Sequence, residues 1–543
     1  MIIWKVKSLR DLKSRIKKQL TLNYSILLFK KALTKLIELM KIIKPCLLLL
    51  SLFVLSCGTN EVQHESLEKK PNILLVFADD MTFEVLDQLE QNKIYTPNLD
   101  KLMSEGTSFR KAYNMGSWSG AVCTASRSMM ISGRSVWNAF KIKEEWKKGD
   151  KKDLTLPKLL ETSGYETYMT GKWHVDVPAL EIFNHAVNIR PGMPKDGWSG
   201  NNMGAKFDSI SKIGAEPHTI MPIGYNRPLS ENEDNWSPSD PAFGGFWEGG
   251  THWSEVLRND AHAFLDSASK SNNPFFMYLA FNAVHDPRQS PGSFLDLYAV
   301  EDIKIPKNFL PVYPYKDEIG NGPALRDEAL APYPRTPYSI KKHLQEYYAI
   351  ISHMDHQIGE IFNELERKGL RENTYIIFTA DHGLAMGRHG LMGKQTMFDH
   401  SMAAPFIISG PNIPKGQRLD QDIYIQDAMA TILDIAGVEK PDYVEFNSLL
   451  NLIQGTEEQI YQDVYGAYLN NQRMIKKDGF KLTVYPKAKK ILLFDMENDP
   501  LEMNDLADQP EHQDLIKTLF AKLQQKQAQL NDALVLKAED YDM

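Results

Sequence analysis

The sequence has only three cysteines among its 543 residues, at positions 46, 57 and 123. The first two belong to an N-terminal hydrophobic segment, so Cys123 is alone in the rest of the chain. A fold held together by intramolecular disulfides is therefore excluded. Cys123 lies in the segment GAVCTASRSMMISGR, although a buried cysteine usually has apolar neighbours. Three interpretations follow: an incidental thiol in a loop, a low-pKa nucleophile beside Arg127, or a residue that is chemically modified.

A concentrated basic surface is also lacking. The formal net charge is -8, and the 62 basic and 70 acidic residues are spread along the chain. A protein that follows a phosphate backbone needs lysine and arginine gathered in a stripe, so we expect no nucleic acid partner. The length exceeds the roughly 250–300 residues that a single core usually supports, which predicts two domains of unequal size.

The leucine block before Cys57 is too short to cross a bilayer as a mature helix. It follows a lysine-containing flank and ends in VLSC, an ending that resembles a bacterial lipobox. We therefore expect residues 1–57 to be an N-terminal extension with a lipoprotein signal, Cys57 to carry lipid, and residues 58–70 to form a polar tether. Met40 is an alternative start of the signal. The protein would be exported and anchored by lipid in the periplasm or outer membrane. A chance hydrophobic helix or a fully secreted, unlipidated chain is the alternative.

Three apolar runs end abruptly in polar residues: PNILLVFADDM, NPFFMYLAFNAVHDP and NTYIIFTADHG. Such runs are typical of strands buried on both faces of a parallel sheet. GYETYMTGKWH reads as another strand, whereas TPNLDKLMSEG and the long stretch from His343 to Gly369 have helical spacing. Strands that alternate with helices predict an α/β domain, with a mixed, mostly parallel sheet sandwiched by helices.

Two regions depart from this alternation. Residues 185–250 are rich in Gly, Pro, Asn and Trp, which predicts long irregular functional loops. After about residue 450, short runs such as QRMIKKDGFKLTVYP resemble antiparallel strands, and a helix is expected from about 510 to 530. We therefore assign residues 71–445 to the α/β domain and 446–543 to a smaller C-terminal α+β subdomain with a short antiparallel sheet.

The carboxyl ends of the predicted strands gather acidic residues. Asp79 and Asp80 could simply cap a following helix. Asp381 and His382 in TADHG, however, come to the same edge of the predicted sheet, where ligands collect in α/β folds. Burying unpaired carboxylates away from water is unfavourable in free energy, so this cluster predicts a bound cation. Its oxygen-rich shell favours Ca²⁺, with Mg²⁺ as the alternative.

These motifs together resemble one family. PNILLVFADD, TPNLDKLMSEGTSF, CTASRSMMISGR, TGKWH, PFFMYLAFNAVHDP, TADHG and HGLMGKQTMFDHSMAAPFII occur in the order found in the type I sulfatases of the alkaline phosphatase superfamily. The similarity runs from about Pro71 to Pro411, and LFDMENDPLEMNDLA is similar to the family's C-terminal domain. It implies an alkaline phosphatase-like fold and a sulfuric ester hydrolase.

The resemblance also implies a role for each matching residue. A maturase would oxidise Cys123 to formylglycine, whose hydrate is the nucleophile, with Ala125 standing where proline is commoner. Asp79, Asp80, Asp381, His382 and the modified Cys123 would hold the metal; asparagine is common in place of His382. The other implied roles are orientation of the formylglycine by Arg127, sulfate binding by Lys172 and Lys394, proton transfer near the nucleophile by His174, protonation of the leaving alcohol by His285, and loop support by His389 and Asp399.

The substrate is less well defined by the sequence. We expect a sulfated polysaccharide or oligosaccharide, and His252, Trp253, Arg288 and His389 are candidate substrate contacts, with Trp236 and Trp247 as further aromatic candidates in the irregular region. A tryptophan is nevertheless more often a core residue. Two alternatives stay open: a phosphonate monoester or phosphodiester hydrolase of the same superfamily, and a glycan-binding lipoprotein that has lost the reaction.

Overall fold

The computed structural model describes residues 30–31, 33–35, 69–85, 92–194, 202–222, 225, 227–233, 237–541 and 543. The chain divides into two units, residues 1–69 and 70–543. Cys57 and Trp236 lie outside the described residues, so lipidation of Cys57 and sugar binding by Trp236 stay predictions. Among the described residues, none of the helices has the length and apolar character needed to cross a membrane.

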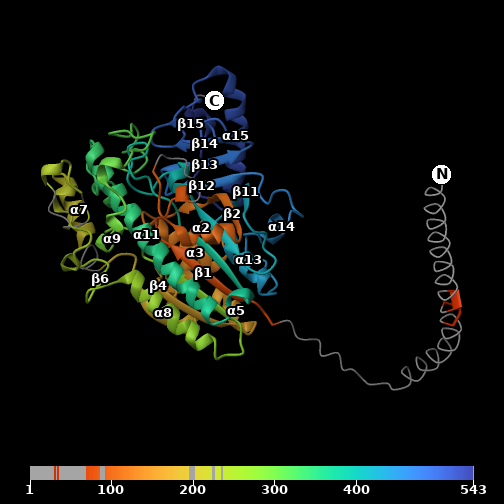
Figure 1. Ribbon diagram of the computed structural model, residues 1–543. Helices are drawn as coiled ribbons and strands as arrows, with labels where there is room; N and C mark the ends of the chain where they lie inside the picture. The colour runs from red at the N-terminus through yellow and green to blue at the C-terminus, as the bar shows by residue number, and fades with distance from the viewer. Residues whose placement is uncertain are drawn as a thin grey trace, which may run out of the picture. The chain divides into compact units, whose positions relative to one another are not determined.

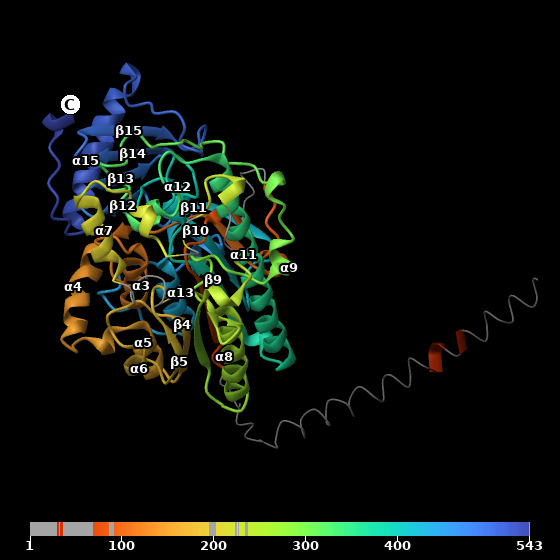
Figure 2. The same cartoon turned by 90° about the vertical axis from the view of Figure 1, so that its left-hand side faces the viewer.

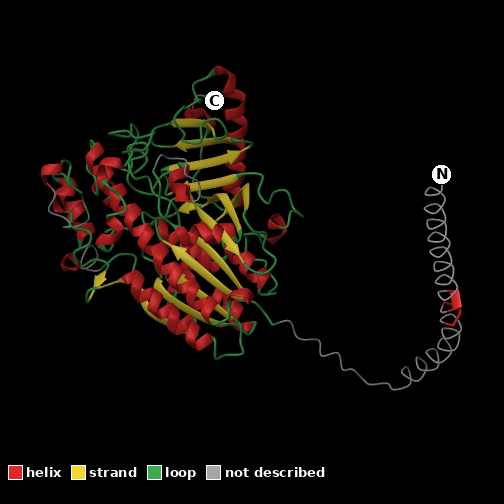
Figure 3. Cartoon of the chain, in the orientation of Figure 1, coloured by secondary structure: helices red, strands yellow, loops and turns green. Residues whose placement is uncertain are grey.

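A mixed sheet of eight strands forms the centre of the unit 70–543 (Figures 1 and 3). All seven residues of β1 (Asn72–Ala78) are buried, as the flat apolar run predicts. Within this sheet, β10 alone runs antiparallel to both of its neighbours. The predicted mixed, mostly parallel sheet is thus confirmed. Its order is β11 (Gln417–Tyr424), β2 (Thr107–Tyr113), β10 (Ala403–Ser409), β9 (Thr374–Ala380), β1, β8 (Phe275–Ala280), β4 (Glu166–Lys172) and β5 (His185–Arg190).

Helices cover both faces of the sheet (Figure 2). One layer is built around the long helix α11, which begins at Pro337, earlier than its apolar spacing predicts, because Thr336 caps it by accepting a hydrogen bond from the Ser339 amide at 3.1 Å. This layer contains α2 (Pro97–Ser104), α8 (Trp253–Ala268), α9 (Gly292–Leu295) and α11 (Pro337–Arg367). The opposite layer contains α3 (Val122–Ser132), α4 (Val136–Lys147), α5 (Leu156–Thr162) and α13 (Asp427–Ile435).

A second sheet lies towards the C-terminus, as predicted. Its four antiparallel strands are β12 (Val464–Tyr468), β13 (Gln472–Lys477), β14 (Phe480–Tyr485) and β15 (Lys490–Asp495). Helix α15 (Gln513–Gln529) packs against β13 and β14. The fifth strand, β3 (Gly116–Ser117), comes from the segment just before Cys123 and pairs in parallel with β12. The small sheet is therefore hydrogen-bonded to the segment that leads into the cysteine motif.

The stretch 185–250 is more regular than its composition indicates. It contains β5, helix α7 (Met203–Lys212) and the first strand of a hairpin formed by β6 (Trp247–Glu248) and β7 (Thr251–His252). Met203 and Phe207, one turn apart on α7, are buried in a small apolar cluster with Met221. Apolar residues at this spacing stabilise a helix even when glycine and asparagine surround it.

The β3–β12 pairing yields a test of how the two sheets are joined. A Cβ on Gly116, where φ is 94°, would lie 1.9 Å from the Ala467 carbonyl oxygen. We expect Gly116→Ala to reduce the free energy of unfolding by about 2–3 kcal/mol, measured by thermal unfolding followed by circular dichroism.

Gly164→Ala is the matched control, because Gly164 has a φ of 88° but no atom within 4 Å of its added Cβ. Its free energy of unfolding should fall by only about 1 kcal/mol, the cost of placing alanine at a positive φ. Equal losses in both variants would show that the contact with Ala467 does not stabilise the fold.

Candidate active site

The strand register brings the predicted acids together. Ala78 at the end of β1 pairs with Ala380 at the end of β9, so Asp79 and Asp381 emerge side by side. The Asp80 amide donates to Asp381 Oδ1 at 3.1 Å, which locks the two strand ends. Both acids and Asp79 are at most 1% exposed. The expected convergence at one sheet edge is therefore what the structure shows.

The two strands on the other side of β1 supply basic residues to the same edge. Lys172 is the last residue of β4 and forms a buried ion pair with Asp79. His285 follows β8, and the Asp79 amide donates to the Ala283 carbonyl of that segment at 3.0 Å. His285 Nε2 lies 3.7 Å from Asp80 Oδ2. Neighbouring parallel strands thus place basic side chains and carboxylates within contact distance.

Cys123 and Arg127 lie one turn apart in helix α3, not in a loop. Arg127 is fully buried and donates through Nε to Asp381 Oδ2 at 3.1 Å and through an Nη atom to the Lys172 carbonyl at 3.0 Å. The guanidinium also lies over the Phe77 ring, 5.0 Å from its centroid. Arg127 therefore ties α3 to three strand ends, and this fixes where Cys123 points.

The Cys123 sulfur lies at the centre of the cluster. Sγ is 3.3 Å from His382 Nε2, 3.4 Å from Lys394 Nζ and 3.9 Å from Asp80 Oδ1. Burial raises the pKa of the Cys123 thiol well above its usual value; Asp79 raises it further, and Lys172 lowers it only in part. A buried thiol in this setting is a weak nucleophile, which argues against the interpretation of Cys123 as a low-pKa nucleophile.

Lys394 reaches the cluster from the segment after β9. Its Nζ lies 2.7 and 2.9 Å from the two carboxylate oxygens of Asp80. Glu328, which sequence reasoning missed, holds this segment by accepting from the Met392 and Gly393 amides at 3.1 Å each. Arg335 forms a buried ion pair with Glu328. No sequence motif marks Glu328, because it acts across 64 residues through backbone groups.

His174 and His285 are both held as neutral rings. Burial, then Lys172 and Arg127, lower the pKa of His174 to about 3. A Cβ on Gly192 would lie 2.6 Å from the His174 ring, so only glycine lets the ring fit there. Burial also lowers the pKa of His285, and its Nδ1 lies 2.8 Å from the Asp286 carbonyl. With Nδ1–H donating to that carbonyl, Nε2 of His285 is left free to exchange a proton.

The donor set fits a divalent cation. Ligand atoms of Asp79, Cys123, Asp381 and His382 lie within 4.8 Å of one another, as do those of Asp79, Asp80, Cys123 and His285. Asp79 Oδ1 is buried without a hydrogen-bond partner, as expected of an oxygen that faces a cation. His382 Nδ1 contacts the Gly383 carbonyl at 3.0 Å, which orients Nε2 towards the carboxylates.

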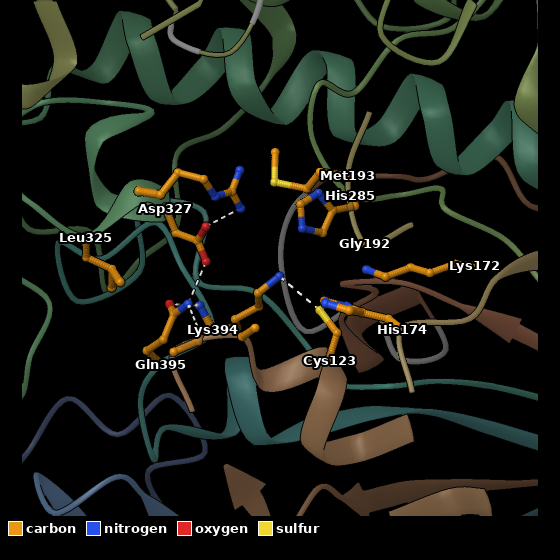
Figure 4. A pocket seen from close by; sticks show the side chains of 13 residues that line it. Cys123, Lys172, His174, Gly192, Met193, His285, Leu325, Asp327, Lys394 and Gln395 are labelled. Carbon is orange, nitrogen blue, oxygen red and sulfur yellow. Dashed lines mark hydrogen bonds and ion pairs between the residues drawn. The ribbon is translucent and has the colours of Figure 1, made fainter. Parts of the chain in front are cut away.

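A cavity of about 290 Å³ opens above the cluster (Figure 4). Cys123, Lys172, His174, His285 and Lys394 point into it from different elements. Its other walls are formed by Gly120, Ala121, Gly192, Met193, Leu325, Arg326, Asp327 and Gln395. Of these residues, Gln395 is next to Lys394 in the quoted motif, whereas Arg326 and Asp327 carried no sequence signal.

The candidate substrate contacts are not among the described residues that line this cavity. Both ring nitrogens of His252 contact backbone, at 3.1 Å to the Ser254 amide and 2.9 Å to the Gln289 carbonyl. The Arg190 guanidinium lies over the Trp253 ring, with its central carbon 4.5 Å from the ring centroid. Their contact with substrate stays a prediction.

Arg288, His389 and Asp399 likewise lie outside the lining. Arg288 is 1% exposed and contacts His343 Nδ1 at 3.0 Å. His389 stacks on Phe398 with ring centroids 3.9 Å apart, an arrangement that fits the loop-supporting role. Asp399 accepts from the Tyr113 hydroxyl at 2.9 Å and pairs with Lys481.

Comparisons with known proteins agree with this geometry. The family described as Sulfatase matches residues 71–438, and the family described as N-sulphoglucosamine sulphohydrolase, C-terminal, matches residues 387–529. An Ulvan-active sulfatase of Formosa agariphila is 25% identical over 516 residues, which cover 92% of this chain and 89% of that protein.

Solved structures share the fold. BT4656 in complex with its substrate D-glucosamine-2-N,6-O-disulfate gives a TM-score of 0.63 at 21% identity and covers 86% of this chain and 99% of that one. The phosphonate monoester hydrolase SpPMH from Silicibacter pomeroyi gives a TM-score of 0.64 at 18% identity and covers 86% of this chain and 98% of that one. The fold therefore supports more than one hydrolytic chemistry, and the site residues must decide between them.

The donor set predicts stabilisation by a metal. Adding Ca²⁺ at about 100 times its dissociation constant should raise the free energy of unfolding by about 2.7 kcal/mol, seen as a higher melting temperature. Asp381→Asn should remove most of this increase, because one carboxylate ligand is lost.

Asp442→Asn, at an exposed position, is the control and should keep the full response to Ca²⁺. Repeating the titration with Mg²⁺ compares the two ions. An unchanged Ca²⁺ response in Asp381→Asn would contradict the assignment of Asp381 as a ligand.

Proposed function

The chain belongs to the sulfatase family and is a sulfuric ester hydrolase, and we propose that it removes sulfate from a sulfated carbohydrate with a formylglycine made from Cys123. The observation that carries the proposal is the position of Cys123. It sits at the floor of the cavity, between Lys394 and His382, in the CTASR segment that the maturase would recognise.

The basic residues of the cavity suit an anionic ester. Attack on a sulfate ester brings negative charge to a group that is already anionic, so the site must concentrate positive charge around the sulfuryl oxygens. Lys172 and Lys394 line the cavity on either side of Cys123 and would bind those oxygens (Figure 4). Arg127 has no exposed surface and would orient the modified residue through α3.

Two histidines would handle the protons. The hydrated aldehyde of formylglycine supplies the oxygen nucleophile at position 123. His174, neutral and with Nδ1 buried without a partner, would take a proton at that nitrogen as sulfate is released. His285, whose one proton is on Nδ1 in the neutral ring, would first take up a second proton at Nε2 from solvent and then give it to the departing alcohol oxygen. The contact of Nδ1 with the Asp286 carbonyl keeps Nε2 aimed at the cavity.

Asp79, Asp80, Asp381 and His382 would hold the cation, with Ca²⁺ preferred and Mg²⁺ as the alternative. When bound, the ion would polarise a sulfuryl oxygen as a Lewis acid. Arg127 holds Asp381 in place and Lys394 holds Asp80. Burial would raise the pKa of Asp80, but the nearby Lys394 ammonium leads the opposing effects that lower it to about 2.

A carbohydrate is the substrate class that the relatives support. One is named for activity on ulvan, and another is solved with a sulfated glucosamine as its substrate. Export as a lipoprotein, with lipid on Cys57 and a location in the periplasm or outer membrane, suits an enzyme that meets such a polymer outside the cytoplasm. Labelling with a radioactive fatty acid, compared with Cys57→Ala, tests the anchor.

One observation keeps phosphonate monoester or phosphodiester hydrolysis as the second candidate. His382 stands beside Asp381 where many sulfatases have asparagine, and the phosphonate monoester hydrolase shares the fold. The ratio of kcat/KM for a nitrophenyl sulfate to that for a nitrophenyl phosphodiester separates the two. A glycan-binding protein without activity is disfavoured because each residue that the reaction needs is present.

The nucleophile is tested at Cys123. The mass of the peptide from Ala112 to Arg127, taken from protein made with an active maturase, should show formylglycine. Cys123→Ala should reduce sulfate release by at least about 10³-fold, with an unchanged circular dichroism spectrum. An intact thiol beside a fully converted control sulfatase would contradict the proposal.

The leaving-group acid is tested at His285. His285→Ala should lower kcat for sugar sulfates by about 10²–10⁴-fold, because an alkoxide leaves poorly without a proton. Nitrophenyl sulfate, whose leaving group needs no proton, should lose far less. Equal losses on both substrates would exclude proton donation by His285.

A further inference from the structure

Asp80 has a backbone conformation that few residues adopt. Its φ is 61°, in the left-handed region that residues other than glycine rarely occupy. Tyr347, on helix α11 in one of the layers over the sheet (Figure 2), contacts the backbone at this point. We infer that Tyr347 is a positioning residue: it holds the Asp80 backbone in this conformation before a cation binds, and so increases the affinity of the site for the cation. The inference rests on the proposed metal site.

The direction of the two neighbouring carboxylates is the first argument. Successive side chains of an extended strand point to opposite faces of a sheet. Asp79 directly follows β1, so another extended residue would carry the Asp80 carboxylate away from that of Asp79. The ligand atoms of both residues nevertheless lie within 4.8 Å of each other in one group. The left-handed φ of Asp80 ends the alternation and brings both carboxylates to one site.

This conformation is unfavourable by itself. The left-handed region brings Cβ of an L-residue too close to the following carbonyl oxygen. Two ionised carboxylates in one small group also repel each other. A residue in such a conformation persists only where the surrounding structure holds it. Contacts within the fold must therefore hold Asp80 in the metal-free protein.

The Tyr347 hydroxyl supplies two of these contacts. It donates to the Asp80 carbonyl at 2.7 Å and accepts from the Thr82 amide at 3.0 Å, and the side chain is buried. The peptide group on the other side of Asp80 is held by Asp381, whose Oδ1 accepts from the Asp80 amide at 3.1 Å. Both peptide groups that flank the Asp80 Cα are thus fixed. Unlike Asp381, Tyr347 is not a candidate ligand, so its contact does not depend on the ion.

The position of the Asp80 carboxylate matters to several groups of the site. Its two oxygens lie 2.7 and 2.9 Å from Lys394 Nζ, and Oδ1 lies 3.4 Å from His382 Nε2. A rotation of the Asp80 backbone would move the carboxylate away from both. A ligand that is oriented in advance loses less conformational freedom when the ion binds. The Tyr347 contact should therefore make the metal site tighter.

Calcium binding to Tyr347→Phe tests the inference. Protein made with an active maturase is freed of metal with a chelator and titrated with Ca²⁺ in a calorimeter. The variant keeps the ring and loses only the hydroxyl, and its dissociation constant for Ca²⁺ should rise by about 10–100-fold. Saturating Ca²⁺ should return kcat for nitrophenyl sulfate close to the wild-type value, because Tyr347 acts through Asp80 and not on the substrate. An unchanged dissociation constant would overturn the inference.

Tyr298→Phe is the matched control. The Tyr298 hydroxyl also accepts from a backbone amide, that of Tyr95 at 2.9 Å, and lies 2.6 Å from Ser352 Oγ. Neither partner belongs to the metal cluster. Both variants should lower the melting temperature of the metal-free protein, whereas only Tyr347→Phe should weaken Ca²⁺ binding. Equal weakening in both would show that lost stability changes the affinity, and the inference would be wrong.

Hydrogen exchange in the wild-type protein decides the matter even if Tyr347→Phe does not fold. The peptide that spans residues 79–84 contains the Asp80 and Thr82 amides, which the structure pairs with Asp381 and Tyr347. These amides should exchange slowly in the metal-free protein, and Ca²⁺ should change their rates little. Rapid exchange that slows only when Ca²⁺ is added would mean that the ion orders this segment, which would overturn the inference.

The outcomes separate this inference from the proposed function. A wild-type protein that binds neither Ca²⁺ nor Mg²⁺ would overturn the proposed metal site and this inference together. A wild-type protein that binds Ca²⁺ and releases sulfate, with a Ca²⁺ affinity that Tyr347→Phe leaves unchanged, would overturn this inference alone.

Discussion

Three buried carboxylates each form an ion pair with a buried cation, and the rest of the site depends on these pairs. Asp79 pairs with Lys172, Asp80 with Lys394, and Asp381 with Arg127. Removing one partner of such a buried pair costs about 3–5 kcal/mol, because the other charge is left uncompensated. Each pair also joins different elements: a strand end with another strand, a loop and a helix.

This arrangement explains why the site combines anionic and cationic groups. The carboxylates suit a cation, and the lysines that hold them also face the cavity where an anionic ester would bind. The same side chains can therefore position metal ligands and contact substrate. Cys123 lies where the two functions meet, with His382 on one side and Lys394 on the other.

Backbone pairing sets these positions from outside the cluster. The Ala78–Ala380 register places Asp79 beside Asp381, and Glu328 holds the amides that precede Lys394. Strand β3 anchors the segment before Cys123 to the C-terminal sheet. The C-terminal sheet thus contributes to the site by fixing the chain that leads into α3, although most residues of the cluster come from the large sheet and its loops.

The sequence by itself determined the sheet and the chemistry of its edge. Continuous apolar runs such as NILLVFA are typical of strands buried on both faces of a parallel sheet. The acidic residues at the ends of such strands stay charged away from water only beside a basic side chain or a metal ion. Tertiary structure alone decided which other residues line the cavity above this edge. Arg326 and Asp327 follow no motif, and they reach the cavity because Glu328, next to them, binds backbone amides 64 and 65 residues away. His252 and Arg288, which residue type marked as candidate substrate contacts, contact the Gln289 carbonyl and His343, and substrate binding by them stays a prediction. The pattern of neighbouring residues in the sequence predicts which strands are buried and where they end. The walls of a cavity are formed by contacts between segments far apart in the chain, which that pattern does not contain.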